Sequence, residues 1–225
     1  MTLRDDLDKL DIKTNPNINE SNIILFTTRL SPSLTEFLQD DFNFELSLRL
    51  VGNLKDQLRI RSIKDENLRF KQLISSLFTN IVLNYLQGTE LFSKVKFTYN
   101  EYGKPQLIEQ GFQFNSSSSN DIVSIVVEYS HKQSPIGIDL SHSVQPAISS
   151  RECVDQFSEI FDFREVSYLK AINDEEKRYF TFNHFWTLKE SFAKLLGSGL
   201  NVNLADFFFK INKEFKEEEY SFTQV

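Results

Sequence analysis

The chain has 225 residues, of which 40% are hydrophobic and 13% aromatic, so it can form one large or two small packed domains and is not a disordered chain. Its net charge of −7 argues against broad binding of nucleic acids. The single cysteine, Cys153, excludes an internal disulfide framework and fits a reducing compartment.

The first part of the chain predicts a polar segment, then a strand and a helix. We expect residues 1–20, which are polar, to be only locally ordered. They lack the basic start and apolar run of a secretory signal, and no later stretch approaches the ~18 apolar residues of a membrane span, so we expect a cytoplasmic protein without membrane contact. Residues 22–28 predict a strand, and Pro32 suits the first turn of a helix that continues through Leu38.

The middle of the chain predicts a long helix and then strands. Residues 65–87 have helical apolar spacing and are followed by a glycine. Residues 95–99 alternate like a strand and lead into a turn at 100–105. Residues 115–120 are low-complexity and polar, which is typical of a flexible surface loop. Residues 122–129 give the clearest strand pattern in the sequence.

The last part of the chain predicts short strands around several helices. Residues 135–140 read as a short strand, and residues 153–161 and 163–171 have helical spacing. Residues 207–212 are rich in phenylalanine and predict one last strand.

The longest predicted helix begins near Asn173, a favourable N-cap residue, and ends at Gly197, the usual left-handed residue after a last turn. Its expected core-facing stripe comprises Leu188, Phe192, Leu195 and Gly199. A second stripe, well round from the first, comprises Trp186, Glu190 and Lys194. Taken alone, Glu190 and Lys194 are typical of a solvated ion pair on an exposed helix face.

Three motifs change that interpretation. The stretch from Trp186 to Leu200 reads Trp-x-x-Lys-Glu-Ser-Phe-x-Lys-x-x-Gly-x-Gly-Leu, and it resembles the signature of the Sfp-type 4′-phosphopantetheinyl transferases. Upstream, in the same order as in that family, stand Gly-Ile-Asp-Leu at 137–140 and Glu-Tyr-Gly-Lys-Pro at 101–105. Short motifs recur by chance, but three in order make a specific resemblance, which extends from residue 55 to residue 205.

The resemblance implies an α+β fold. In the family this fold is a pseudo-dimer of two similar halves, each a small antiparallel sheet with a long helix, and the active site lies between them. Here the halves are expected at residues 21–125 and 126–225, and the second half carries the metal and catalytic motifs. Several more strands usually follow this motif in the family, whereas 25 residues follow Leu200 here, so we expect either a shortened second half or an incomplete chain. Because a pseudo-dimer supplies both halves of its own site, we expect a monomer.

The resemblance also implies an activity. Family members transfer the 4′-phosphopantetheine arm of coenzyme A to a serine of an apo carrier-protein domain and release 3′,5′-ADP. Among acyl, peptidyl and aminoadipate reductase carriers, we expect aminoadipate reductase of lysine biosynthesis as the acceptor. By position in the motifs, Asp139 and Glu190 match carboxylates that hold Mg²⁺, Glu190 also matches a catalytic base, and Lys194 matches a lysine on the coenzyme A phosphates. Ser141 stands where bacterial relatives have a third carboxylate, so water is expected to complete the Mg²⁺ shell.

Further residues match the nucleotide-binding part of the family site. Lys104 matches a residue near the nucleotide phosphates, and Arg59 falls where the family has a basic residue for the 3′-phosphate, with Arg61 as a close rival. Ser117 and Ser118 end the stretch Phe-Asn-Ser-Ser-Ser at 114–118, which resembles the family motif Phe-Asn-x-Ser-His. Ser118 stands where histidine is common, and its hydroxyl can bond a phosphate oxygen but brings no positive charge.

Two other functions stay open at this point. A protein of the same fold could bind coenzyme A and have weakened catalysis, which the short C-terminal part and Ser118 favour. An adaptor could instead hold an acidic partner helix on the locally basic segment 45–71.

Overall fold

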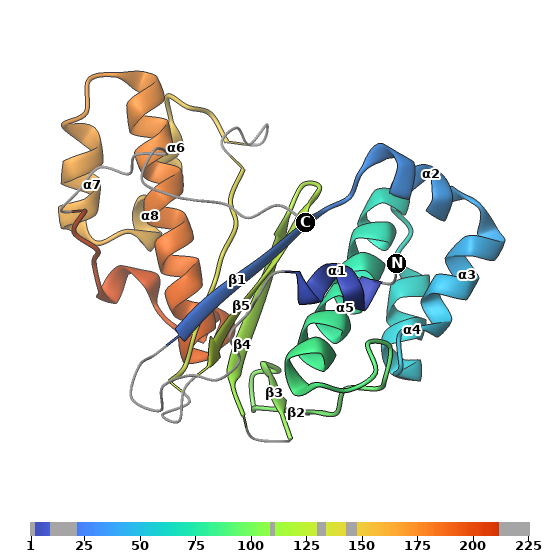
Figure 1. The fold of residues 1–225 in the computed structure, drawn as a ribbon. Helices are drawn as coiled ribbons and strands as arrows, with labels where there is room; N and C mark the ends of the chain where they lie inside the picture. The colour runs from blue at the N-terminus through green and yellow to red at the C-terminus, as the bar shows by residue number, and fades with distance from the viewer. Residues whose placement is uncertain (1–2, 10–21, 109–110, 130–133, 143–147, 212–225) are drawn as a thin grey trace. The chain divides into compact units, whose positions relative to one another are not determined.

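The computed structural model describes residues 3–9, 22–108, 111–129, 134–142 and 148–211 (Figure 1). The polypeptide forms two compact units. Unit 1 comprises residues 1–99 and 105–136, and unit 2 comprises residues 100–104 and 137–224. Helices and small antiparallel sheets make up the described chain, which confirms the predicted α+β class. The division into halves at residue 126 and the pseudo-dimer stay predictions.

Unit 1 contains the sheets. Its elements are α1 (Leu3–Asp8), β1 (Asn22–Arg29), α2 (Pro32–Gln39), α3 (Asp41–Arg49), α4 (Leu54–Ser62), α5 (Glu66–Gln87), β2 (Phe97–Tyr99), β3 (Pro105–Leu107), β4 (Gln113–Ser119) and β5 (Ile122–Tyr129). One antiparallel sheet has the order β1-β5-β4, and β2 pairs with β3 in a separate two-stranded ribbon. The predicted strand at 22–28 and the predicted helices at 32–38 and 65–87 are confirmed.

Strand β4 corrects the prediction of a flexible loop at residues 115–120. It pairs with β5 from Gln113 opposite Glu128 to Ser119 opposite Ile122, and the turn between them places Asn120 at φ 49°. Asparagine tolerates this left-handed conformation, which suits a tight hairpin. Serine has a weak strand propensity of its own, so pairing with the apolar strand β5 overrides the local composition.

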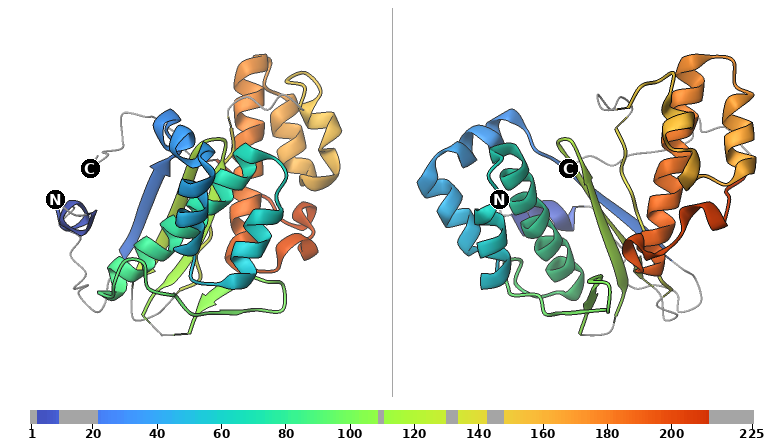
Figure 2. Two further views of the ribbon diagram at one scale, coloured as in Figure 1. Left: turned by 90° about the vertical axis from the view of Figure 1, so that its right-hand side faces the viewer. Right: turned by 180° about the vertical axis from the view of Figure 1, so that it is seen from behind.

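Helix α5 covers one face of the three-stranded sheet, as Figure 2 shows. Leu83 from the helix packs with Phe114, Ile125 and Val127 from the strands in one core cluster. A second cluster joins α5 to the helices α2, α3 and α4. In unit 1, α5 therefore packs between the sheet and an additional layer formed by α2, α3 and α4.

Unit 2 is mainly helical in its described residues. Its elements are α6 (Cys153–Gln156), η1 (Ser158–Ile160), α7 (Phe163–Lys170), α8 (Glu175–Leu196), η2 (Gly199–Asn201) and η3 (Leu204–Asp206). The strands predicted at 135–140 and 207–212 are wrong wherever the structure describes those residues, because residues 135–140 and 207–211 are extended without a pairing strand, while residue 212 lies outside the described part. The apolar run at 207–211 instead packs on α8, where Phe207 and Phe209 contact Phe192.

Helix α8 is the longest element of unit 2 and lies beside α7 (Figure 1). Its N-cap is Asp174, whose side chain accepts a hydrogen bond from Lys177, so the predicted start is one residue early. Its end at Gly197, with φ 69°, is as predicted. The fully buried face is not the predicted stripe, whose leucines and phenylalanine are only half-buried. It comprises Phe182, Phe185 and Lys189.

Candidate active site on helix α8

Three of the predicted site residues meet in unit 2. Asp139 lies in the extended segment 134–142, and Glu190 and Lys194 lie one turn apart on α8. The Lys194 Nζ atom donates to Asp139 Oδ1 at 2.6 Å, and the Asp139 side chain is only 11% exposed. The site therefore joins two segments that are about fifty residues apart in the sequence.

The electrostatics of this cluster centre on Glu190. Burial and the neighbouring charge of Asp139 raise the pKa of Glu190, and Lys194 partly opposes that shift. Two neighbouring carboxylates with only one ammonium group beside them favour further positive charge. No group of three or more histidine, cysteine, aspartate or glutamate residues with metal-binding geometry is found in the part of the chain that the structure describes.

Gly137 allows the segment that carries Asp139 to approach α8. A Cβ atom at this position would collide with the carbonyl oxygen of Ser191 and lie 2.5 Å from the amide nitrogen of Leu195. Both contacts are with helix backbone, which cannot rotate away as a side chain can. The Gly-Ile-Asp motif thus needs its glycine for close packing, two residues before the carboxylate.

We expect Gly137→Ala to destabilise unit 2 by about 1 to 3 kcal/mol, the usual cost of overpacking, because the segment has to move away from the helix. Chemical unfolding of the variant measures this loss. Gly111→Ala is the matched control, since a Cβ at Gly111 meets nothing within 4 Å. Equal stability of the two variants would show that the segment is not held against α8.

Lys104 lies at the C-terminal end of α8. Its Nζ atom donates to the carbonyl oxygens of Lys194 at 2.7 Å and Leu195 at 3.1 Å. Burial lowers the pKa of Lys104. The structure therefore places this predicted phosphate-binding lysine on the helix end that carries Lys194.

The remaining predicted residues belong to unit 1. Arg59 is exposed on α4 and lies 3.5 Å from Asp56, while its rival Arg61 pairs with Glu45 on α3. On β4, Ser117 is buried and Ser118 is exposed. Their roles in nucleotide binding stay predictions.

Ser141 follows Asp139 by two residues in unit 2. Its hydroxyl lies 3.5 Å from Asn183 Oδ1 on α8. The position of the family's third carboxylate thus holds a neutral side chain beside a neutral amide.

Lys189 is a residue whose importance the sequence-based prediction missed. It stands directly before Glu190 in the motif, but it is fully buried and forms an ion pair with Glu165 Oε2 at 2.8 Å. Its Nζ atom also donates to the carbonyl oxygens of Leu204 at 2.6 Å and Phe207 at 2.7 Å. These three acceptors match the three N–H bonds of an ammonium group, so the Lys189 side chain is structural. Its spacing from the buried phenylalanines was the signal that could have revealed this.

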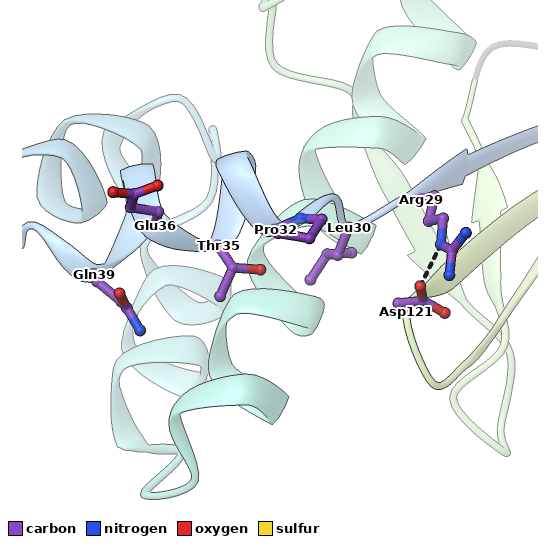
Figure 3. Close-up of a pocket in the computed structure, with 7 residues that line it drawn as sticks. All are labelled: Arg29, Leu30, Pro32, Thr35, Glu36, Gln39 and Asp121. Atoms are coloured by element: carbon purple, nitrogen blue, oxygen red, sulfur yellow. Dashed lines mark hydrogen bonds and ion pairs between the residues drawn. The ribbon is translucent and has the colours of Figure 1, made fainter.

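A separate hollow of about 500 Å³ lies in unit 1, where β1 passes into α2 (Figure 3). Arg29 forms an ion pair with Asp121 at its edge, and Glu36 adds a second negative charge. None of the sequence-predicted site residues lines it.

Neither of the two long helices among the described residues is apolar enough to cross a membrane.

Comparisons with known proteins give a consistent result. The family model of the 4′-phosphopantetheinyl transferase superfamily matches residues 135–222. The L-aminoadipate-semialdehyde dehydrogenase-phosphopantetheinyl transferase of Saccharomyces cerevisiae is 29% identical over 174 residues, which cover 76% of this chain and 61% of the yeast protein. The protein of that name in Candida glabrata is 29% identical over 193 residues, or 83% of this chain and 69% of its own length. The transferase Sfp of Bacillus subtilis is 32% identical over 123 residues, or 54% of this chain and 50% of Sfp.

The matched region contains the cluster on α8. Asp139, Glu190 and Lys194 all lie inside residues 135–222. The chain spans 61% of the length of its Saccharomyces cerevisiae relative. The resemblance to the 4′-phosphopantetheinyl transferases that the motifs carry is confirmed by the family model and by these relatives.

Proposed function

We propose that the protein transfers the 4′-phosphopantetheine arm of coenzyme A to a serine hydroxyl of an apo carrier-protein domain. The observation that carries this proposal is the cluster of Asp139, Glu190 and Lys194, which puts two carboxylates and an ammonium group at the positions of the matching motifs. In this reaction the serine oxygen forms a bond to phosphorus, and the bond from phosphorus to the oxygen of 3′,5′-ADP breaks.

The donor set of the site fits a magnesium ion. Asp139 and Glu190 offer carboxylate oxygens, and Mg²⁺ commonly takes one or two protein carboxylates together with substrate phosphates and water. Burial and the charge of Asp139 both disfavour ionised Glu190, and a cation beside the two carboxylates would favour the ionised form. When bound, Mg²⁺ supplies charge neutralisation for the diphosphate of coenzyme A.

The side chains of the chain itself have distinct roles in the proposed reaction. Glu190 accepts the proton of the attacking serine, a role that a carboxylate can fill when it lies within hydrogen-bond reach of the hydroxyl. Lys194 has its ammonium group beside Asp139, where it can balance negative charge on the phosphate oxygens. Asp139 orients that ammonium group through their hydrogen bond.

The relatives' names support one acceptor in particular. The proteins of Saccharomyces cerevisiae and Candida glabrata are both named for L-aminoadipate-semialdehyde dehydrogenase. We therefore propose the carrier domain of such a reductase, in lysine biosynthesis, as the first acceptor to test. A cytoplasmic monomer remains part of the proposal.

Mass spectrometry of apo carrier domains tests the function. Incubation with this protein, coenzyme A and MgCl₂ is expected to add the mass of one phosphopantetheine arm at the carrier serine, and a metal chelator is expected to prevent it. A serine-to-alanine carrier is the control. Tight binding of coenzyme A in calorimetry without transfer to acyl, peptidyl or reductase carriers would contradict the proposed function and favour a coenzyme A-binding protein.

A further inference from the structure

The turn at Asn100–Lys104 is organised by the Asn100 side chain. Asn100 Oδ1 accepts hydrogen bonds from the backbone nitrogens of Tyr102 at 3.0 Å and Lys104 at 2.8 Å. The backbone closes the turn, since Gly103 N donates to Asn100 O at 3.0 Å and Asn100 N donates to Lys104 O at 3.1 Å. Gly103 has φ 86°, a conformation that favours glycine. The turn is therefore a preformed unit that presents the side chains of Asn100 and Lys104 in one place.

That turn satisfies the end of α8. A helix leaves its last four carbonyl oxygens without partners inside the helix. Lys104 Nζ donates to two of them, those of Lys194 and Leu195, and Asn100 Nδ2 donates to the carbonyl oxygen of Gly197 at 2.7 Å. Three carbonyl oxygens at the end of α8, including that of its C-cap residue Gly197, thus receive hydrogen bonds from outside the helix.

The turn also packs closely against the end of α8 at Gly197. A Cβ atom at Gly197 would lie 2.8 Å from Lys104 Cδ and 2.9 Å from Asn100 Nδ2. The ammonium group of Lys104 also lies at the negative end of the helix dipole, which otherwise disfavours a nearby anion such as a phosphate. The contact therefore fixes the last turn of α8 and offsets its negative partial charge.

We propose that Lys104 is a positioning residue that acts through the last turn of α8, where it holds Lys194 in line with Asp139. This inference rests on the proposed transfer function. It differs from the sequence-based expectation for Lys104, because the side chain acts on the helix end instead of directly on a nucleotide phosphate. The two roles have different experimental signatures.

Hydrogen exchange of the protein alone tests the cap without any activity. We expect Lys104→Met, which keeps the length of the side chain but removes its donors, to speed exchange of the amides at 195–197 on the order of tenfold, the size of one or two lost hydrogen bonds. Lys96→Met, at an exposed lysine, is the control and should leave them unchanged. Unchanged exchange in Lys104→Met would overturn the proposal.

Kinetics then separate positioning from phosphate binding. Lys104→Met is expected to lower kcat at saturating coenzyme A. Lys104→Arg keeps N–H donors for the carbonyl oxygens of Lys194 and Leu195, so its kcat is expected to lie much closer to that of the wild type. Asn100→Asp keeps the acceptor that organises the turn but loses the donor to Gly197, so it should lower kcat as well. If Lys104→Met raises only KM, and dephospho-coenzyme A abolishes the difference from wild type, Lys104 binds the phosphate and the positioning role is wrong.

The two proposals fail in different ways. Absence of transfer by the wild-type protein would overturn the proposed function, and the exchange comparison would still decide whether the turn caps α8. Wild-type transfer together with normal exchange and normal kcat in Lys104→Met would overturn the positioning role alone.

Discussion

Glu190→Gln is expected to lower transfer by at least ~100-fold, the scale of a lost general base, because the amide cannot accept the serine proton and provides a weaker ligand for a cation. The volume and the helix propensity stay nearly the same, so the fold is preserved. Single-turnover transfer at saturating coenzyme A measures the loss. Glu176→Gln, in the exposed first turn of α8, is the control. Turnover near the wild-type rate in Glu190→Gln would remove Glu190 from the mechanism.

The same variant is expected to melt at a higher temperature than the wild type at neutral pH in the presence of a metal chelator. The folded protein raises the pKa of Glu190 above its unfolded value, so ionised Glu190 costs stability at pH values above the folded pKa. This cost disappears as the pH falls towards the unfolded pKa, because the folded state then holds the proton. The advantage of glutamine should therefore be present near neutrality and vanish in acid. An advantage that is independent of pH would show that charge is not its cause.

Lys189→Met is expected to be the most destabilising single substitution among those considered, at about 3 to 5 kcal/mol, because it leaves the buried Glu165 without its counter-ion. Two backbone carbonyls, those of Leu204 and Phe207, lose a donor in addition. Urea unfolding of the purified variant gives the change in the free energy of unfolding.

Two comparisons make this result specific. Lys170→Met breaks an exposed ion pair with Asp155 and is expected to change stability by less than about 1 kcal/mol. Adding Glu165→Gln to Lys189→Met removes the uncompensated charge and should recover part of the loss. Equal effects of Lys189→Met and Lys170→Met would mean that Lys189 does not hold the core of unit 2.

Which side chains lie side by side on α8 can be predicted from the sequence more readily than which segments pair as strands. The spacing of Glu190 and Lys194 on one helix is local and follows from helix geometry, and the motif supplies the link to Asp139. The pairing of a serine-rich segment as β4 depends instead on β5, and the absence of pairing at residues 135–140 depends on close packing against α8. Both outcomes are decided by tertiary contacts that local composition does not contain.

The predicted core face of α8 shows the same limit. Leucine and phenylalanine spacing favoured the stripe through Leu188 and Phe192, whereas the fully buried face includes Lys189. A lysine is rarely buried unless it is paired, and its partner Glu165 lies on another helix, 24 residues away in the sequence. No pattern within α8 alone could have indicated this partner.

Helix α8 forms ionic contacts in two directions. Lys189 is paired with Glu165 in the core, and Lys194, five residues later and about 140° further round the helix axis, is paired with Asp139. Inserting or deleting one residue between them would turn one lysine by about 100° relative to the other, so both pairs could not form together. The number of residues in this stretch is therefore constrained more strictly than the residue types at 191–193, and homologues that keep the chemistry should vary in type at those three positions without an insertion or deletion between Lys189 and Lys194.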